Sequence, residues 1–478
     1  MKDILIKNVK VYDYQRKGDV KDIYILDGKI KKIGNKLDKK ASKVINGKGL
    51  YLFPGLVDPH VDAVWAKGDG DAGLRMLLKA GVTTATDFKG PVEFLHDVVK
   101  KSNVGLNIAS LNGVCLENGF NKLEIKKDEI KKFAKESMKK GSIGLKIMGG
   151  HFPITFETSK DVIQICNDLG IYIAYHAGNS DNGSNILGMK DAVKAAGKNS
   201  LHIAHINSYC RGQIYQVSKE SDMALTMLKK NKNLISESYL SAINGTSSEV
   251  GEDKKPLSHV TRNCLKAKGY NDDYEDFKKA ILNKDCAISK EEEGVIKLLY
   301  GKEAFEYWDK MKTKATACFD VNPALSRIAL AIDKTDSNFT VDMISTDGGI
   351  FPRNETIKLG LKLVEFGALT INELLLKSSY IPSRVLGLYN KGCIEEGFDA
   401  DLTLVNPKNS EVLATIVGGN LAYENGKFFD NKTNLIILKE GEKYVKSLGL
   451  PYTIVSIKDS MFYKKKKFLK KEKKWKEF

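Results

Sequence analysis

Residues 52–62, LFPGLVDPHVD, are the stretch that decides the fold. This short apolar run contains a proline–glycine turn and ends in His60 and Asp62. Two later apolar runs end in histidine as well, IYIAYH at His176 and LHIAH at His205, although the whole chain holds only seven histidines. Buried parallel strands that direct such side chains from their C-terminal ends into one space are typical of the metal site of a (β/α)8 barrel.

The central part of the chain repeats this pattern often enough to form the barrel. Strand-like runs alternate with amphipathic, helix-like stretches, several of which end at a glycine. After PGLVDPH the runs are TTATDF (83–88), LNIASL (106–111), IGLKIM (143–148), IYIAYH (171–176), LHIAHI (201–206), LISESYL (234–240) and VDMIST (341–346). Eight such repeats are the number that closes a TIM-type barrel, which we place at residues 51–390. Residues 247–318 are highly charged and carry no obvious strand, so we expect a helical insertion between strands 7 and 8 that caps the barrel mouth.

The two ends of the chain read as β structure. Residues 1–50 alternate in period two around Asp27-Gly28, and residues 391–432 do so around Asn425-Gly426. Both dipeptides favour tight hairpin turns. We expect the two segments to pair into a small composite β-sandwich domain beside the barrel, with residues 433–478 as a C-terminal extension.

Composition excludes several classes of protein. Hydrophobic content is 42% and charged content is 28%, as in ordinary globular proteins. We find neither the apolar core of a signal peptide nor a membrane-spanning run. The seven cysteines form no CxxC pair, which favours a reducing, cytoplasmic location over a disulfide framework.

The net charge of +16 is concentrated at one end of the chain. Residues 461–478 hold nine lysines and two glutamates, so 9 − 2 = +7 of the total lies there. This tail is either a surface for RNA or anionic membranes, or a solvated, partly disordered end; we favour the second. We therefore expect no specific nucleic-acid partner and no membrane partner, and we expect a homo-oligomer, either a dimer or a tetramer.

Three positions carry the metal chemistry beside the two strand-terminal histidines. His60 and Asp62 are two residues apart on a strand, so both side chains can face the barrel axis. Lys146 lies in the buried run GLKIM, where a charged amine is costly. Either carbon dioxide has carbamylated its amine, making a carboxylate that bridges two metal ions, or the amine reaches solvent at the strand end. Because two strand-terminal histidines lie on neighbouring strands, we favour Lys146 as a metal ligand over a lysine that reaches solvent.

The eighth strand ends in Asp347, within STDGG. A carboxylate here can hold a metal-bound water and pass its proton to a leaving nitrogen; the alternative is an aspartate that stabilises a turn. Arg211 and Arg353 are candidates for binding a substrate carboxylate, since guanidinium pairs with carboxylate bidentately. His151 and Asn244 are further candidates for substrate binding, and a surface or turn role is as plausible for all four.

Together these segments resemble the amidohydrolase superfamily, in the branch of dihydropyrimidinases, hydantoinases, dihydroorotases and N-acyl-D-amino-acid deacylases. The resemblance spans roughly residues 1–430. It rests on DILIKNVKVYD, DIYILDGKIKKIG, PGLVDPHVD, GVTTATDF, GLKIM, AYH, HIAH, STDGG and KGCIEEGFDADLTLVNP. It implies that His60 and Asp62 hold one metal ion, that His176 and His205 hold another and that Lys146 bridges them, with Asp347 as acid/base.

One position departs from the family pattern, because Asp62 stands where a second histidine is usual. Either a carboxylate ligand gives that site a harder character, or the site is weak and one metal ion dominates. We therefore expect one or two divalent ions, zinc foremost and manganese as the alternative.

The function that follows is hydrolysis of a non-peptide C–N bond by metal-bound hydroxide, with Asp347 moving the proton. The small-molecule amide substrate is either a hydantoin- or dihydropyrimidine-like ring or an N-acyl amino acid. The cap at 247–318 favours the acyl substrates and Lys146 the cyclic ones. The alternative is a catalytically decayed barrel that serves as an interaction scaffold, for which the loss of a histidine at position 62 would be a first step.

Overall fold

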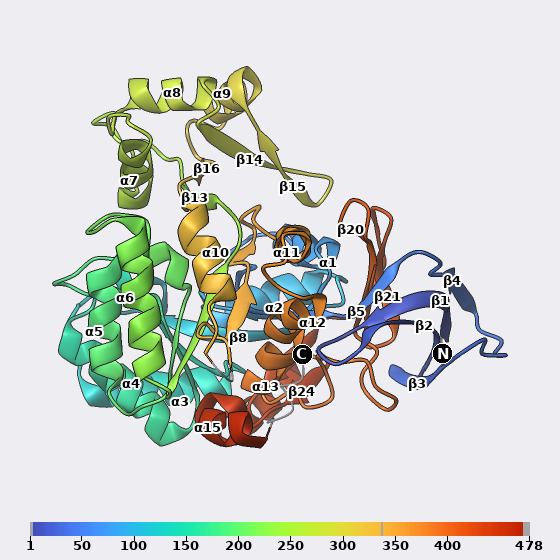
Figure 1. The fold of residues 1–478 in the computed structure, drawn as a ribbon. Helices are drawn as coiled ribbons and strands as arrows, with labels where there is room; N and C mark the ends of the chain where they lie inside the picture. The colour runs from blue at the N-terminus through green and yellow to red at the C-terminus, as the bar shows by residue number, and fades with distance from the viewer. Residues whose placement is uncertain (1–2, 336–337, 472–478) are drawn as a thin grey trace.

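The computed structural model describes residues 3–335 and 338–471 (Figure 1). Its centre is a curled sheet in which all eight strand-like runs form parallel strands in chain order. They are β6 (Leu56–Asp62), β7 (Val82–Asp87), β8 (Asn107–Val114), β9 (Gly144–Ile147), β10 (Tyr172–Tyr175), β11 (Leu201–Ile203), β12 (Leu234–Tyr239) and β17 (Met343–Ser345). Almost every residue in them is buried, which is why they read as continuous apolar runs.

Residues 343–349 contact both ends of this sheet. β17 pairs with β12, and the two-residue strand β18 (Gly348–Gly349) pairs with β6. Between them the amide of Asp347 donates to the carbonyl of His60 over 2.9 Å. The first and eighth strand segments therefore lie side by side, with Asp347 at their junction.

Helices connect the strands and cover the sheet from outside (Figure 1). The main ones are α1 (Ala72–Lys79), α2 (Val92–Lys101), α3 (Lys127–Lys139), α4 (Phe156–Leu169), α5 (Ile186–Ala196), α6 (Val217–Lys230), α10 (Ala324–Ile332) and α11 (Thr356–Glu365). Local signals fix their ends: the Thr155 side chain accepts from the amide of Thr158 at the start of α4, and Gly170 ends that helix at φ 68°. A glycine adopts this left-handed conformation without steric cost, as its place in the sequence predicted.

The two ends of the chain form one separate sheet of nine strands. It combines β1 (Ile4–Tyr12), β2 (Lys17–Leu26), β3 (Lys29–Gly34), β4 (Lys43–Asn46) and β5 (Tyr51–Pro54) with β19 (Leu402–Asn406), β20 (Glu411–Val417), β21 (Asn420–Glu424) and β22 (Lys427–Phe428). β5 joins the halves, because it pairs with β1 on one side and with β19 on the other. At Asn425-Gly426 both residues have positive φ, 48° and 87°, as the predicted hairpin turn requires.

The insertion between β12 and β17 is a mixed unit, so our expectation of a purely helical segment at 247–318 was wrong. Residues 243–320, which we call the cap unit, contain a four-stranded sheet of β13 (Ile243–Ser247), β16 (Thr316–Asp320), β14 (Cys286–Glu292) and β15 (Val295–Leu299). Its helices are α7 (His259–Ala267), α8 (Tyr274–Leu282) and α9 (Gly301–Lys310). The hairpin Cys286–Leu299 escaped notice because its outer half is exposed and rich in lysine and glutamate.

The C-terminal extension packs on the curled sheet. β23 (Asn434–Ile437) pairs with β8 and with β24 (Tyr452–Ile454), and α14 (Glu442–Ser447) lies between them in the chain. The described part of the lysine-rich tail is the helix α15 (Met461–Lys471), which is docked through buried Phe462 rather than solvated along its whole length. The rest of the tail, residues 472–478, lies outside the described residues. Within residues 3–335 and 338–471, no helix is long and apolar enough to span a membrane.

Candidate metal centre

The predicted ligands converge at the C-terminal ends of the parallel strands. Because these strands share one direction, their ends meet at one edge of the curled sheet, where a pocket of about 730 Å³ opens. The predicted residues that line this pocket are Asp62, Lys146, His151, His176, His205, Arg211, Asn244, Asp347 and Arg353. His60 lies directly beneath, fully buried.

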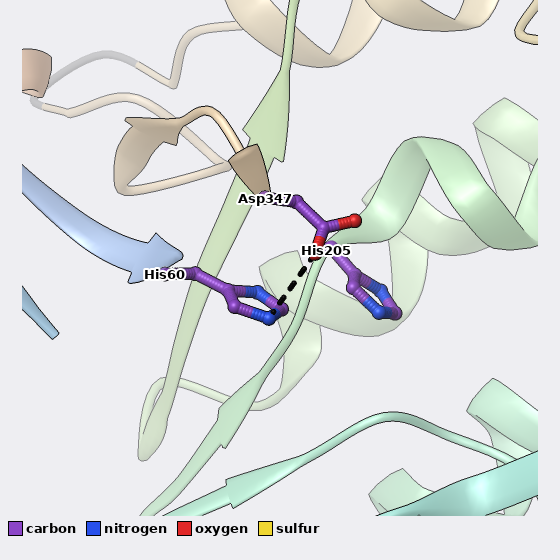
Figure 2. Close-up of side chains that lie close together, drawn as sticks. All are labelled: His60, His205 and Asp347. Carbon is purple, nitrogen blue, oxygen red and sulfur yellow. Dashed lines mark ion pairs between the residues drawn. The ribbon is translucent and has the colours of Figure 1, made fainter. Parts of the chain in front are cut away.

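His60, His205 and Asp347 form the centre of the site (Figure 2). One possible ligand atom from each lies within 4.8 Å of the others, and the Nε2 of His60 is 3.3 Å from the Oδ1 of Asp347. The Nζ of Lys146 approaches the same Nε2 to 3.5 Å. Side chains from the first, fourth, sixth and eighth strands are thus brought to one point, as the sequence predicted.

His176 joins this group through His205. The Nδ1 of His176 is 2.7 Å from the Nε2 of His205, and its Nε2 is 3.0 Å from the hydroxyl of Ser184. When Nε2 donates its proton to Ser184, the lone pair on Nδ1 faces His205. At this distance the Nε2 of His205 donates its proton to the Nδ1 of His176. The buried Nδ1 of His205, which has no hydrogen-bond partner in the described part of the chain, is then left with a free lone pair.

Asp62 completes the expected set but stands apart from the central group. The Oδ1 of Asp62 is buried without a hydrogen-bond partner in the described part of the chain. Asp62 is not one of the three residues whose possible ligand atoms lie within 4.8 Å of one another. A buried carboxylate oxygen without a donor is costly unless a cation balances it. The donor set, with its orphan oxygen and the free lone pair of His205, therefore fits a divalent metal ion.

The backbone is strained at two of these positions. His205 has φ 73° and Asp347 has φ 48°, a left-handed conformation that non-glycine residues seldom adopt. Such conformations cost on the order of 1–3 kcal/mol and persist where the surroundings enforce them, often at functional sites.

Burial sets the protonation of the ligands. It lowers the pKa of His60, His176 and His205 well below the ordinary histidine value, so these imidazoles are neutral at pH 7 and offer lone pairs. Burial also raises the pKa of Asp347 to about 7, against the opposing effect of Arg353. The Nη2 of Arg353 is 2.7 Å from the Oδ2 of Asp347.

Sequence reasoning missed Glu237, a fully buried residue in β12. Its Oε1 lies 2.7 Å from the Nδ1 of His60, and its Oε2 accepts from the hydroxyl of Ser345. A carboxylate on the far nitrogen of a ligating histidine fixes the tautomer and the ring orientation. The signal was present in LISESYL, where one acid interrupts a run that must be buried.

His202 does not follow the alternation of its strand. Period-two alternation would put it, three residues before His205, on the outer face of the strand. Instead it lies inside the sheet, with Nδ1 2.8 Å from the hydroxyl of Tyr172 and Nε2 3.9 Å from Glu237. The alternation fails because β11 ends at Ile203 and His205 turns the chain with its positive φ.

The four candidates for substrate binding differ in their contacts. Arg353 is committed to Asp347, whereas Arg211 contacts only neutral oxygens, including the Oδ1 of Asn244 at 3.1 Å. The ring of His151 lies 5.1 Å from that of His176, between centroids. All four face the same pocket, over which the cap unit contributes part of the wall.

A parallel strand–helix fold with neutral imidazoles, a lysine and a carboxylate gathered at the strand ends is typical of metal-dependent hydrolases. Comparison with known proteins agrees: the model of the amidohydrolase family matches residues 51–422. The chain belongs to the amidohydrolase family and is a hydrolase acting on carbon–nitrogen bonds other than peptide bonds.

Individual relatives span nearly the whole chain. A dihydroorotase from Elusimicrobium minutum is 26% identical over 88% of this chain and 98% of its own length. The structure of a dihydropyrimidinase from Brevibacillus agri NCHU1002 matches with a TM-score of 0.61 at 14% identity, covering 95% of this chain and 99% of that one. A D-aminoacylase described as having a binuclear metal center matches with a TM-score of 0.62 at 14% identity, covering 91% and 99%. At this identity the two structural likenesses show the fold.

Proposed function

We propose that this protein is a metal-dependent amidohydrolase that opens a cyclic amide of the hydantoin or dihydropyrimidine type, or cleaves an N-acyl amino acid. The observation that carries the proposal is the convergence on one point: Lys146 and Asp347 lie 3.5 and 3.3 Å from the Nε2 of His60. A surface or core role for these residues would not need three distant strands to present them together.

The ligand assignment follows the resemblance to the amidohydrolase family. His60 and Asp62 would hold one ion, His176 and His205 the other, and Lys146, carbamylated, would bridge them. Zinc suits imidazole and carboxylate ligands, and manganese is the alternative. The orphan Oδ1 of Asp62 supports two ions, whereas its absence from the group of His60, His205 and Asp347 supports a single dominant one.

The chain's own residues handle binding and proton transfer. When bound, a divalent ion polarises a carbonyl and lowers the pKa of water from 15.7 towards ~7. Asp347 takes the proton from the attacking water and delivers it to the departing nitrogen. Arg353 holds the carboxylate of Asp347 in place by two contacts, one to Oδ2 and one to the backbone carbonyl.

The choice of substrate follows from relatives and pocket together. The dihydroorotase and dihydropyrimidinase support a cyclic amide, and the D-aminoacylase supports an acyl amino acid. Arg211, Arg353, His151 and Asn244 would contact the substrate. An interaction scaffold is not favoured, because the site keeps its two facing imidazoles and its neutral histidines.

The finer architecture belongs to the same proposal. The pairing of residues 343–349 with both β12 and β6 supports closure into a (β/α)8 barrel. Because β5 (Tyr51–Pro54) belongs to the nine-stranded sheet, the boundary between β domain and barrel moves from residue 50 to residue 54. We retain 391–432 as the rest of the β domain, 390 as the last residue of the barrel and 433–478 as the extension. Seven free, buried cysteines support a cytoplasmic location, and we keep the homo-oligomer as an expectation.

The test is metal reconstitution followed by a substrate screen. Zinc- and manganese-loaded protein is assayed with hydantoins, dihydropyrimidines and N-acyl-D-amino acids, and bound metal is quantified. Lys146→Ala should lose both metal and turnover. The matched control is Lys377→Met, which removes another buried lysine that donates to the carbonyls of Ala331 and Val341. Stoichiometric metal in both variants would defeat the assignment.

A further inference from the structure

Arg211 is a half-buried cation whose neighbours leave its charge unbalanced. Its Nε donates to the Oδ1 of Asn322 at 2.8 Å, and its Nη2 donates to the Oδ1 of Asn244 at 3.1 Å and to the hydroxyl of Tyr239 at 3.2 Å. A longer contact of 3.4 Å reaches the hydroxyl of Ser208. All of these acceptors are neutral.

No carboxylate lies within ion-pairing distance of Arg211 in the part of the chain that the structure describes. The hydrogen bonds of its guanidinium in the described residues all come from Nε and Nη2 and none from Nη1, and the residue lines the pocket. Arg353, which lines the same pocket, differs in this respect because Asp347 neutralises it. A guanidinium held in place by neutral groups and open on one side is prepared for an anion.

The acceptors that fix Arg211 come from both stems of the cap unit. Asn244 is in β13, where the chain enters the cap unit, and Asn322 follows β16, where the chain leaves it. Asn322 is itself held by donating to the carbonyls of Ala242 and Ile243 at 3.0 and 3.1 Å. The cap unit therefore aims the guanidinium at the pocket and supplies no negative charge to it.

We infer that the substrate carries an anionic group, a carboxylate, and that Arg211 pairs with it at the boundary between the curled sheet and the cap unit. This inference rests on the proposed amide hydrolysis and narrows its substrate class: acidic amides are accepted in preference to uncharged ones of the same shape. In the competing account, which we call the strut, Arg211 has only a structural role: its hydrogen bonds hold the cap unit against the sheet, and it binds no anion.

One substitution separates these accounts. Asn244→Asp keeps the oxygen that accepts from Arg211 and gives up only a weak contact of 3.6 Å to the sulfur of Cys264. It places a carboxylate against the guanidinium and so balances its charge, while the tie between cap unit and sheet is strengthened. Asn263→Asp is the matched control, because Asn263 lines the same pocket and is not among the hydrogen-bond partners of Arg211.

The first measurement uses two pairs of amides that differ in charge and hardly in shape. Hydantoin-5-acetate is compared with hydantoin-5-acetamide, and an N-acetyl-D-amino acid with its primary amide. For the metal-loaded full chain we expect kcat/KM to favour the acid by about 10- to 100-fold, the strength of a charged hydrogen bond. In Asn244→Asp that ratio should collapse, and in Asn263→Asp most of it should remain. A strut predicts equal ratios in all three proteins and would overturn the inference.

The second measurement does not depend on turnover. Crystals of the full chain are soaked in sodium bromide, and bromide is located by anomalous scattering. We expect bromide at the Nη1 of Arg211 in the unmodified protein and none in Asn244→Asp. Bromide elsewhere but not at Arg211 would overturn the inference even if amides are hydrolysed. Bromide at Arg211 in a protein that hydrolyses no amide would instead refute the proposed function and leave the anion site standing.

Discussion

The Nδ1 of His60 lies 2.7 Å from the Oε1 of Glu237, and both side chains are completely buried. His60 and Glu237 come from the first and seventh parallel strands, so this contact crosses the interior of the sheet. It leaves the Nε2 of His60 directed at Lys146 and Asp347. Glu237, which is outside the expected ligand set, thus determines that His60 presents Nε2 to the metal site.

Replacing that carboxylate should weaken metal binding. We expect Glu237→Gln to lower metal affinity by about 10- to 100-fold, the usual cost of losing a partner that orients a ligating histidine. Competitive titration with a chelator measures the effect. Asp342→Asn is the control, since Asp342 is also buried but accepts from Ser236 at 3.0 Å and pairs with Lys465 at 2.7 Å instead. Equal loss of affinity in the two variants would contradict the orienting role.

His202 and His205 are close in sequence and should respond differently to substitution. His202→Ala leaves the buried hydroxyl of Tyr172 without its 2.8 Å partner, so we expect unfolding to become easier by about 1–3 kcal/mol with metal retained. His205→Ala removes a nitrogen of the central group and should abolish stoichiometric metal. Denaturant unfolding and metal analysis on both variants check this, and metal loss in His202→Ala would count against the assignment.

In metal-free protein the buried carboxyls should contribute less to stability as pH rises, against the opposite contribution of the buried histidines, whose pKa values are lowered. Burial raises the pKa of Asp58, Asp87 and Asp347 to about 7 from an ordinary value of 3.8, so folding favours their protonated forms. Stability from these groups is fully present below pH 3.8 and is lost as pH rises to about 7. Denaturant unfolding at pH 5 and at pH 8 measures the difference.

Asp87→Asn tests the source of that slope. In the unmodified protein the backbone N–H of Ala63 donates to the Oδ1 of Asp87 over 2.8 Å. The side-chain oxygen of an asparagine can accept the same hydrogen bond, but an asparagine does not titrate. We expect the stability of Asp87→Asn relative to the unmodified protein to rise from pH 5 to pH 8. The same stability difference at both pH values would show that Asp87 makes no such contribution.

We expect the lysine-rich C-terminal segment to stabilise the fold by packing, and we do not expect it to bind a partner. Phe462 is fully buried, with its ring centroid 4.4 Å from that of Tyr172. Phe462→Ala should therefore cost about 3–5 kcal/mol in the free energy of unfolding. Truncation after residue 460 should lower the melting temperature as well, whereas truncation after Lys471 should leave turnover unchanged. A thermal melt of the three variants, with an activity assay, decides between packing and partner binding.

The parallel strands and most residues of the candidate metal centre could be predicted because both produce patterns within short stretches of sequence. A strand buried on two faces is a continuous apolar run, and a ligand at its end is a polar residue at a fixed place. The hairpin Cys286–Leu299 produced no such pattern, since lysine and glutamate on its open face imitate a surface helix. Glu237 and His202 were missed because their roles depend on a contact across the sheet and on the left-handed turn at His205.

The place of β5 between β1 and β19 has a consequence for synthesis on the ribosome. Residues 51–54 cannot acquire their second neighbour until residues 402–406 have been translated. For most of that time the nascent N-terminal sheet has an open edge, and such edges invite pairing with other chains. The N-terminal half of the sheet is thus completed only after about 350 further residues have been made, and β5 is the edge at which a neighbouring chain could pair in the meantime.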